Sequence, residues 1–115
     1  MKRFGLIGYP LGHSFSKKYF TEKFEREGIE DCEYELYPLE SIDELPDLIK
    51  SEKGLIGLNV TIPYKEQVIK LLDEIDPKAE QIGAVNTIVF KDNKRLGYNT
   101  DHIGFQNTLL NHLKP

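Results

Sequence analysis

The sequence predicts an α/β domain of three layers, in which an open, mainly parallel twisted sheet of about five to six strands carries helices on both faces. Two observations lead to this prediction. Short apolar runs alternate along the chain with segments of helical periodicity, as in β/α units built around a parallel sheet. Near the C-terminus, two strand-like runs flank the polar turn Lys91-Asp92-Asn93-Lys94, which predicts a hairpin and therefore one antiparallel strand.

The first half of the chain is predicted to contain two strands and two helices. Residues 3–8 form an apolar strand, and residues 16–27 form a helix that ends before Gly28. Residues 32–37 alternate apolar and charged side chains, so this strand is expected near a sheet edge with one side in water. The capping-box pair Ser41 and Glu44 predicts a second helix that runs towards Lys50. Pro46 leaves the exact start of this helix open.

The second half continues the alternation. Residues 54–60 are an interior strand, and residues 63–74 are predicted to form a helix. Asp76-Pro77 has the form of an N-cap followed by proline and predicts a short helix that Gly83 closes.

The predicted hairpin consists of residues 84–90 and 95–99, and a last helix begins near Asp101. If residues 95–99 run with the parallel strands, residues 84–90 must run against them. The start of one strand and the end of the other then share one edge of the sheet. Asn86 and Asp101 are therefore expected to be neighbours.

Composition excludes several classes of protein. The chain has 115 residues, of which 39% are hydrophobic and 30% charged, as in a single globular domain. Its net charge of −4 and lack of a long basic cluster argue against a nucleic-acid partner. No apolar run approaches the ~20 residues that span a bilayer, so no membrane association is expected. The single cysteine, Cys32, favours a reducing compartment, and we expect a cytoplasmic protein.

Polar residues follow several of the predicted strands, where ligands bind in open α/β sheets. The set is His13, Ser14, Ser16, Asn59, Thr61, Lys65, Asn86 and Asp101. It is mostly uncharged, with one lysine and one aspartate, which suits a small, hydroxyl-rich molecule better than a polyphosphate or a metal. The sequence contains no GxGxxG or P-loop pattern, no zinc-type His/Cys spacing and no GxSxG elbow. No cofactor or metal is therefore expected on this chain.

Each candidate also has a purely structural explanation. Ser14 or Ser16 can be the N-cap of the first helix, and Thr61 can cap the helix predicted to follow it. Asn86 can pair with backbone groups. Asp101 is favourable in a first helical turn because of the helix dipole.

Lys65 is the exception among these residues. In the helix predicted for residues 63–74 it lies on the same side as Val68, Ile69 and Leu72, whereas the other charged residues cover the opposite side. A cation in the first turn also opposes the helix dipole, at a cost of roughly 0.3–1 kcal/mol. We therefore expect Lys65 to be functional, with snorkelling past the helix end as the alternative.

Four motifs, GYPLGHSFS, NVTIPYK, GAVNTIV and GYNTDHIGF, resemble in order and spacing those of the N-terminal, substrate-binding domain of shikimate dehydrogenases. The resemblance extends from Phe4 to Phe105. It implies an NADP-dependent oxidoreductase that interconverts 3-dehydroshikimate and shikimate in the biosynthesis of aromatic amino acids. It also implies that residues 1–115 are the substrate-binding domain and that the NADP-binding Rossmann domain lies outside this chain. The chain alone is then expected to be inactive.

The resemblance further implies a role for each candidate. Ser14 and Ser16 resemble the pair that hydrogen-bonds the substrate carboxylate. Lys65 and Asp101 resemble the catalytic pair beside the hydroxyl that is oxidised. The substrate hydroxyls would be bound by three further residues, Asn59, Thr61 and Asn86.

Two positions depart from the family pattern. Lys17 stands where a proline is usual, and His102 stands where a small residue is common. The first bears on the start of the helix and the second on the mouth of the site. A relative that acts on quinate therefore remains an alternative, as does a stand-alone binding module without chemistry.

Overall fold

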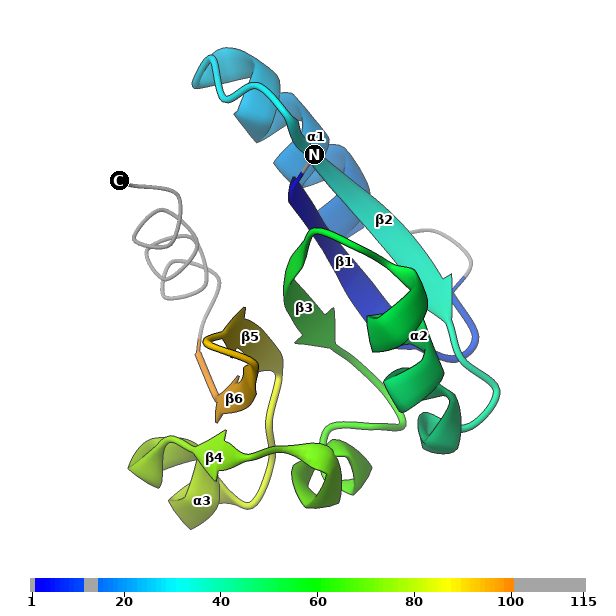
Figure 1. Ribbon diagram of the computed structural model, residues 1–115, viewed down its shortest axis with the longest axis vertical. Helices are drawn as coiled ribbons and strands as arrows, with labels where there is room; N and C mark the ends of the chain where they lie inside the picture. Colours follow the sequence, from blue (N-terminus) through cyan, green and yellow to red (C-terminus); the bar gives the residue numbers. More distant parts are fainter. Residues whose placement is uncertain (1, 12–14, 101–115) are drawn as a thin grey trace.

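A six-stranded sheet runs through the molecule in the order β2-β1-β3-β5-β6-β4 (Figure 1). The computed structural model describes residues 2–11 and 15–100. The strands are β1 (Lys2–Gly8), β2 (Cys32–Pro38), β3 (Leu55–Val60), β4 (Glu74–Ile75), β5 (Thr87–Lys91) and β6 (Lys94–Tyr98). The α-helices are α1 (Phe15–Arg26), α2 (Leu45–Ser51) and α3 (Pro77–Ile82), and the 3-10 helices are η1 (Ile42–Glu44) and η2 (Gln67–Leu71).

The strand directions confirm the predicted fold class. β1 is parallel to β2 and β3, and β4 is parallel to β6, whereas β5 runs antiparallel to both β3 and β6. The hairpin turn between β5 and β6 contains Asp92 at φ 54° and Asn93 at φ 63°. Tight two-residue hairpin turns require this left-handed backbone, and Asp and Asn tolerate it better than other non-glycine residues.

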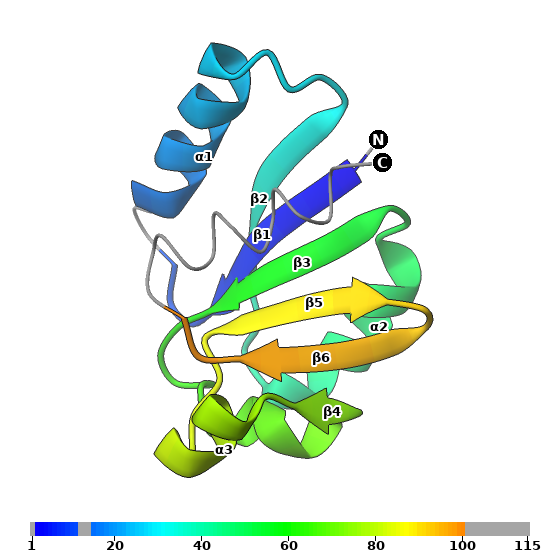
Figure 2. The ribbon, with the colours of Figure 1, turned by 90° about the vertical axis from the view of Figure 1, so that its left-hand side faces the viewer.

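Helices cover both faces of the sheet, with α1 and α2 on opposite sides (Figure 2). On the α1 side, Phe20 stacks on Tyr34 of β2 with ring centroids 5.1 Å apart, and both are buried with Phe4 of β1. On the other side a larger apolar cluster joins Leu45 of α2 to Leu58 of β3. The predicted three-layer arrangement is therefore confirmed.

The predicted caps are also present. The Ser41 hydroxyl accepts a hydrogen bond from Asp43 N, and the Glu44 carboxylate accepts one from Ser41 N, which completes the capping box. It starts the short 3-10 helix η1, and α2 follows directly. Asp76 caps α3, and Gly83 ends this helix at φ 81°. Short-range polar signals thus place these boundaries correctly.

The helix predicted over residues 63–74 is wrong. The segment forms turns, then the 3-10 helix η2, and then the short strand β4 at the edge of the sheet. Asp73 N donates to Arg95 O at 2.9 Å, and Asp73 Oδ2 accepts from Arg95 N at 2.7 Å. The end of the segment therefore bonds to β6, so its backbone groups are not available to continue a helix.

Lys65 consequently does not occupy the inward side that the helical periodicity predicts. Tyr64 is buried instead and its hydroxyl donates to Leu39 O, whereas Lys65 is exposed. Val68 is buried, as predicted. The apolar spacing is real, but it belongs to turns and a 3-10 helix and not to an α-helix that starts at residue 63.

β3 carries one residue more than β1 along their pairing. Arg3 lies opposite Leu55, but Phe4 lies opposite Gly57, which leaves Ile56 as an extra residue in β3. Such a β-bulge shifts the register of everything that follows it in the strand.

Two tyrosines give opposite predictions for the same chemical change. The buried hydroxyl of Tyr37 on β2 has no hydrogen-bond partner among the described residues, whereas that of Tyr64 donates to Leu39 O. We expect Tyr37→Phe to raise the free energy of unfolding by about 0.5–1 kcal/mol, because it removes an unsatisfied polar group. Tyr64→Phe should lower it by about 1–2 kcal/mol, because the Leu39 carbonyl loses its donor. Denaturant unfolding measures both changes, and equal signs would contradict this prediction.

Tyr37 also gives the protein a pH dependence. Burial, followed by the nearby Glu52 carboxylate, raises the pKa of Tyr37 to about 12. In the unfolded chain a tyrosine titrates near ~10, so the unfolded state loses its proton first as the pH rises. Ionisation of Tyr37 therefore has no effect on stability below pH ~10, and it lowers the free energy of unfolding as the pH rises from ~10 towards ~12. Tyr37→Phe should lessen the loss of stability in this alkaline range, and an unchanged slope would argue against it.

Candidate functional site

Three segments that carry predicted site residues meet at one end of the sheet. In Figure 2 the arrows of β3 and β6 point towards this end, and β5 starts there. Val60 N donates to Asn86 O at 2.8 Å, and Asn86 N donates to Tyr98 O at 3.0 Å. Val85 N donates to Lys65 O at 2.7 Å. These backbone hydrogen bonds bring the end of β3, the turn that carries Lys65, and the β5–β6 hairpin together.

The side chain of Asn86 fastens the end of the described chain to β5. Its Oδ1 accepts from Thr100 N at 2.9 Å and from Thr87 Oγ1 at 3.1 Å, and its Nδ2 donates to Thr100 O at 2.6 Å. Asn86 therefore pairs with backbone groups, which was the structural alternative to ligand binding at this position. An amide nitrogen has two hydrogens, and the described residues accept only one of them. Within residues 2–11 and 15–100, the second amide hydrogen of Asn86 is therefore unused.

Asn59, at the end of β3, has its amide orientation fixed by a neighbour. Tyr34 Oη donates to Asn59 Oδ1 at 2.7 Å. Because the amide oxygen is engaged, the nitrogen is the group left to donate to a ligand. Asn59 is half-buried, so a ligand could displace water from it at modest cost.

Thr61 follows β3 and lies against β1. Its backbone N donates to Ile7 O at 2.9 Å, and its carbonyl accepts from Tyr64 N at 3.0 Å. No helix begins here, so Thr61 does not have the capping function offered as its structural explanation. Its half-buried hydroxyl has no hydrogen-bond partner among the described residues.

The ammonium group of Lys65 is exposed and forms no ion pair with any described residue. Its backbone is held by Val85, so the start of the side chain is fixed while the charged end can reach a ligand. A lysine in this position can donate a proton or stabilise a developing negative charge.

Several predicted residues lie outside the part of the chain that the structure describes. They are His13, Ser14, Asp101 and His102, together with the side chain of Ser16. Asp101 follows Thr100 directly in the sequence, and Thr100 is the residue held by Asn86. Lys17, which replaces the usual proline, lies in the first turn of α1 and pairs with Glu35 of β2 at 3.3 Å.

Two residues of the site region were not singled out from the sequence. Tyr34 is one of the apolar positions of an alternating strand, and nothing in that pattern signals that its hydroxyl reaches Asn59. Gly8 allows the close approach of Thr61: a Cβ at Gly8 would lie 2.5 Å from Thr61 Cγ2. The glycine at the end of a buried strand was the available signal.

Within residues 2–11 and 15–100, no group of three or more His, Cys, Asp or Glu side chains could hold a metal ion. In the same part of the chain, no helix is long and apolar enough to cross a membrane.

The contact between Gly8 and Thr61 can be tested with a matched pair of variants. Gly8→Ala is expected to lower the free energy of unfolding by about 1–3 kcal/mol, because the new methyl group overlaps Thr61 and approaches Ile62 O to 3.0 Å. Gly57→Ala is the control, since its Cβ would lie 3.4 Å from the nearest atom, Ile88 O, an ordinary contact. Thermal or denaturant unfolding compares the two. Equal losses would show that the packing at Gly8 is not special.

Comparisons with known proteins agree on one family. A model described as the shikimate dehydrogenase substrate binding domain matches residues 6–88. The shikimate dehydrogenase (NADP(+)) of Bacillus cytotoxicus is 46% identical over 108 residues, which cover 92% of this chain and 38% of the relative. The crystal structure of shikimate dehydrogenase 1 from Peptoclostridium difficile superposes with a TM-score of 0.78 at 41% identity, covering 96% of this chain and 41% of that one.

A second solved structure is that of shikimate 5-dehydrogenase from Thermus thermophilus in complex with shikimate. It has a TM-score of 0.79 and 34% identity, and the match covers 100% of this chain and 44% of that one. The chain thus spans about two fifths of the length of the relatives that it matches.

Proposed function

The chain belongs to the shikimate dehydrogenase family, and we propose that it is the substrate-binding and catalytic part of an NADP-dependent shikimate dehydrogenase. The reaction is the reduction of 3-dehydroshikimate to shikimate in the synthesis of aromatic amino acids. The observation that carries the proposal is the meeting of Asn59, Thr61, Lys65 and Asn86 at one end of the sheet. An enzyme of this kind, with its single cysteine free, would act in the cytoplasm.

The substrate is a small ring with one carboxylate and several hydroxyl groups, and the described side chains offer hydrogen-bond partners for the hydroxyls. Asn59 and Asn86 each keep an amide hydrogen, and the Thr61 hydroxyl can donate or accept. Ser14 and Ser16 would bind the carboxylate, as the family resemblance implies. None of these groups requires the ligand to carry a phosphate.

Lys65 and Asp101 would carry the proton transfer. As the carbonyl carbon is reduced, negative charge develops on its oxygen, and the Lys65 ammonium donates a proton to that oxygen. In the oxidation of shikimate the same group receives the proton back. Asp101 would hold the Lys65 ammonium beside the reacting oxygen. The position of Thr100, clamped to Asn86, supports this pairing, because Asp101 is the next residue.

The described residues do not fit a dinucleotide cofactor. β1 is followed by Tyr9, Pro10 and Leu11, not by the glycine-rich turn that lets a backbone approach a pyrophosphate. NADP, which supplies the hydride, is therefore proposed to bind a part of the enzyme beyond this chain.

Steady-state kinetics of the full-length enzyme test the proposal. With NADP, shikimate is expected to be oxidised with a higher kcat/KM than quinate. A preference for quinate would instead identify the quinate-specific relative. Binding of shikimate to the chain without turnover in the full-length protein would identify a binding module.

A further inference from the structure

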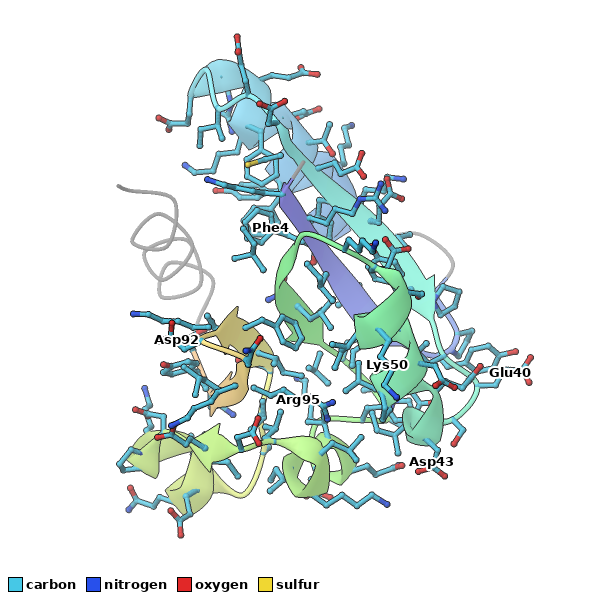
Figure 3. The ribbon with its side chains drawn as sticks, in the orientation of Figure 1. Phe4, Glu40, Asp43, Lys50, Asp92 and Arg95 are labelled. Atoms are coloured by element: carbon cyan, nitrogen blue, oxygen red, sulfur yellow. The ribbon has the colours of Figure 1, made fainter. Side chains whose placement is uncertain are left out.

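A hollow with a volume of about 480 Å³ lies at the opposite end of the sheet from the candidate site. It is bounded by α2, the start of β3 and the β5–β6 hairpin, and Figure 3 shows Lys50 on one side and Asp92 and Arg95 on the other. We propose that this hollow binds a small organic anion with an apolar ring, such as an aryl phosphate or an aryl carboxylate. Leu55 begins β3 at the hollow, and Val60 ends it at the candidate site about 16 Å further along the strand.

The charges that line the hollow differ in sign from the charge of the whole chain, which is −4. The cations are Lys50, Lys53, Lys91, Lys94 and Arg95. The carboxylates are Glu52 and Asp92. An excess of positive side chains concentrated around one concave surface attracts anions more strongly than the same charges spread over a flat surface.

Most of this positive charge is not neutralised by neighbours. Glu52 is already ion-paired with Arg3, which leaves Asp92, at the tip of the hairpin, as the other lining carboxylate. Three lysines, Lys50, Lys53 and Lys91, form no ion pair within the described residues. They are exposed, so their ammonium groups can turn towards a ligand.

Lys94 and Arg95 add to the field in different ways. Lys94 pairs with Glu74 at 3.2 Å, but both side chains are largely exposed, so this pair is weak. Arg95 Nη1 donates to Leu71 O at 3.1 Å. A carbonyl oxygen orients the guanidinium without cancelling its charge. Arg95 is therefore a fixed cation beside the hollow.

The apolar part of the lining decides the class of ligand. Ile49, Leu55 and Phe90 line the hollow and are only partly buried against the larger apolar cluster. A ring laid on these side chains would remove apolar surface from water, which inorganic phosphate cannot do. The volume also lies within the range of small-molecule sites, about 300–1,000 Å³.

Titration of the 115-residue chain with phenyl phosphate, followed by NMR of its backbone amides, tests the proposal. We expect saturable shifts at the hollow, and at least about tenfold weaker binding of inorganic phosphate, which leaves the apolar side chains uncovered. The double substitution Lys53→Glu with Lys91→Glu should weaken phenyl phosphate binding by at least about tenfold. The neutral pair Lys53→Gln with Lys91→Gln should give an intermediate loss.

The matched control is Lys70→Glu with Lys78→Glu, which makes the same change in net charge at two exposed lysines away from the hollow. This control should bind phenyl phosphate as the parent chain does. Equal weakening by both double substitutions, or equal affinity for phenyl phosphate and inorganic phosphate, would overturn the proposal, because binding would then reflect general charge alone.

Discussion

Replacing Lys65 by methionine in the full-length enzyme is expected to lower kcat for shikimate oxidation by about 10²- to 10⁴-fold, the usual contribution of a general acid or base. Affinity for shikimate should change by less than about threefold, because the hydroxyl and carboxylate ligands remain. Stability should not change, since the Lys65 side chain is exposed and forms no ion pair with a described residue. The measurements are steady-state kinetics and calorimetric titration of shikimate.

Lys70→Met is the matched control for this experiment. Lys70 is an exposed lysine of η2 in the same segment as Lys65. Its loss should leave kcat unchanged. If Lys65→Met kept most of the activity, another group would have to move the proton and the assignment of Lys65 would be wrong.

Asn86→Ala is expected to lower the free energy of unfolding by about 2–3 kcal/mol and to weaken shikimate binding at least about tenfold. The amide makes three hydrogen bonds, two with the backbone of Thr100 and one with the Thr87 hydroxyl. The two backbone groups of Thr100 lose this partner, while the Thr87 hydroxyl keeps one contact, to Thr100 Oγ1 at 3.2 Å. Thr87 is buried, so the contact with the Thr100 hydroxyl becomes the remaining hydrogen bond of its side chain among the described residues.

Asn99→Ala provides the comparison. Asn99 Nδ2 donates a single hydrogen bond, to Ala84 O at 3.0 Å, and its loss should cost about 1 kcal/mol. Denaturant unfolding gives the stability of both variants, and titration of shikimate gives their affinity. A binding defect in Asn86→Ala that is no larger than in Asn99→Ala would assign Asn86 a structural function alone.

Much of the fold was predictable because its signals are local. Three of these signals involve residues that lie close together in the sequence. They are the capping box of Ser41 and Glu44, the Asp76 cap and the Asp92-Asn93 turn. The helix over residues 63–74 could not be rejected in this way. The pairing of Asp73 with Arg95, which makes the end of this segment an edge of the sheet, is a long-range contact. The apolar spacing before Asp73 fits both an α-helix and the observed turns and 3-10 helix.

The candidate site was predictable to the extent that topology determines it. The antiparallel strand of the hairpin predicts that Asn86 and Asp101 are neighbours. Asn86 binds Thr100, the residue before Asp101, and because Asp101 lies outside the described residues the pairing itself stays a prediction. The exposure of Lys65 was not predictable, because it follows from the buried position of Tyr64. The proposed function of Lys65 in proton transfer is supported by its motif and by the hydrogen bond from Val85 N to its carbonyl oxygen.

The bulge at Ile56 determines which face of the sheet each later side chain of β3 points to. It therefore also determines which layer of the molecule the end of β3 faces. Successive side chains of a strand point to opposite faces, so one extra residue exchanges the two faces beyond it. With the bulge, Asn59 pairs with Leu6 and shares a face with Tyr34. Without it, Asn59 would lie opposite Ile7, facing the larger apolar cluster, where its amide would lack partners. A single unpaired residue, about 10 Å from Asn59, thus determines the side of the sheet from which a ligand can be reached.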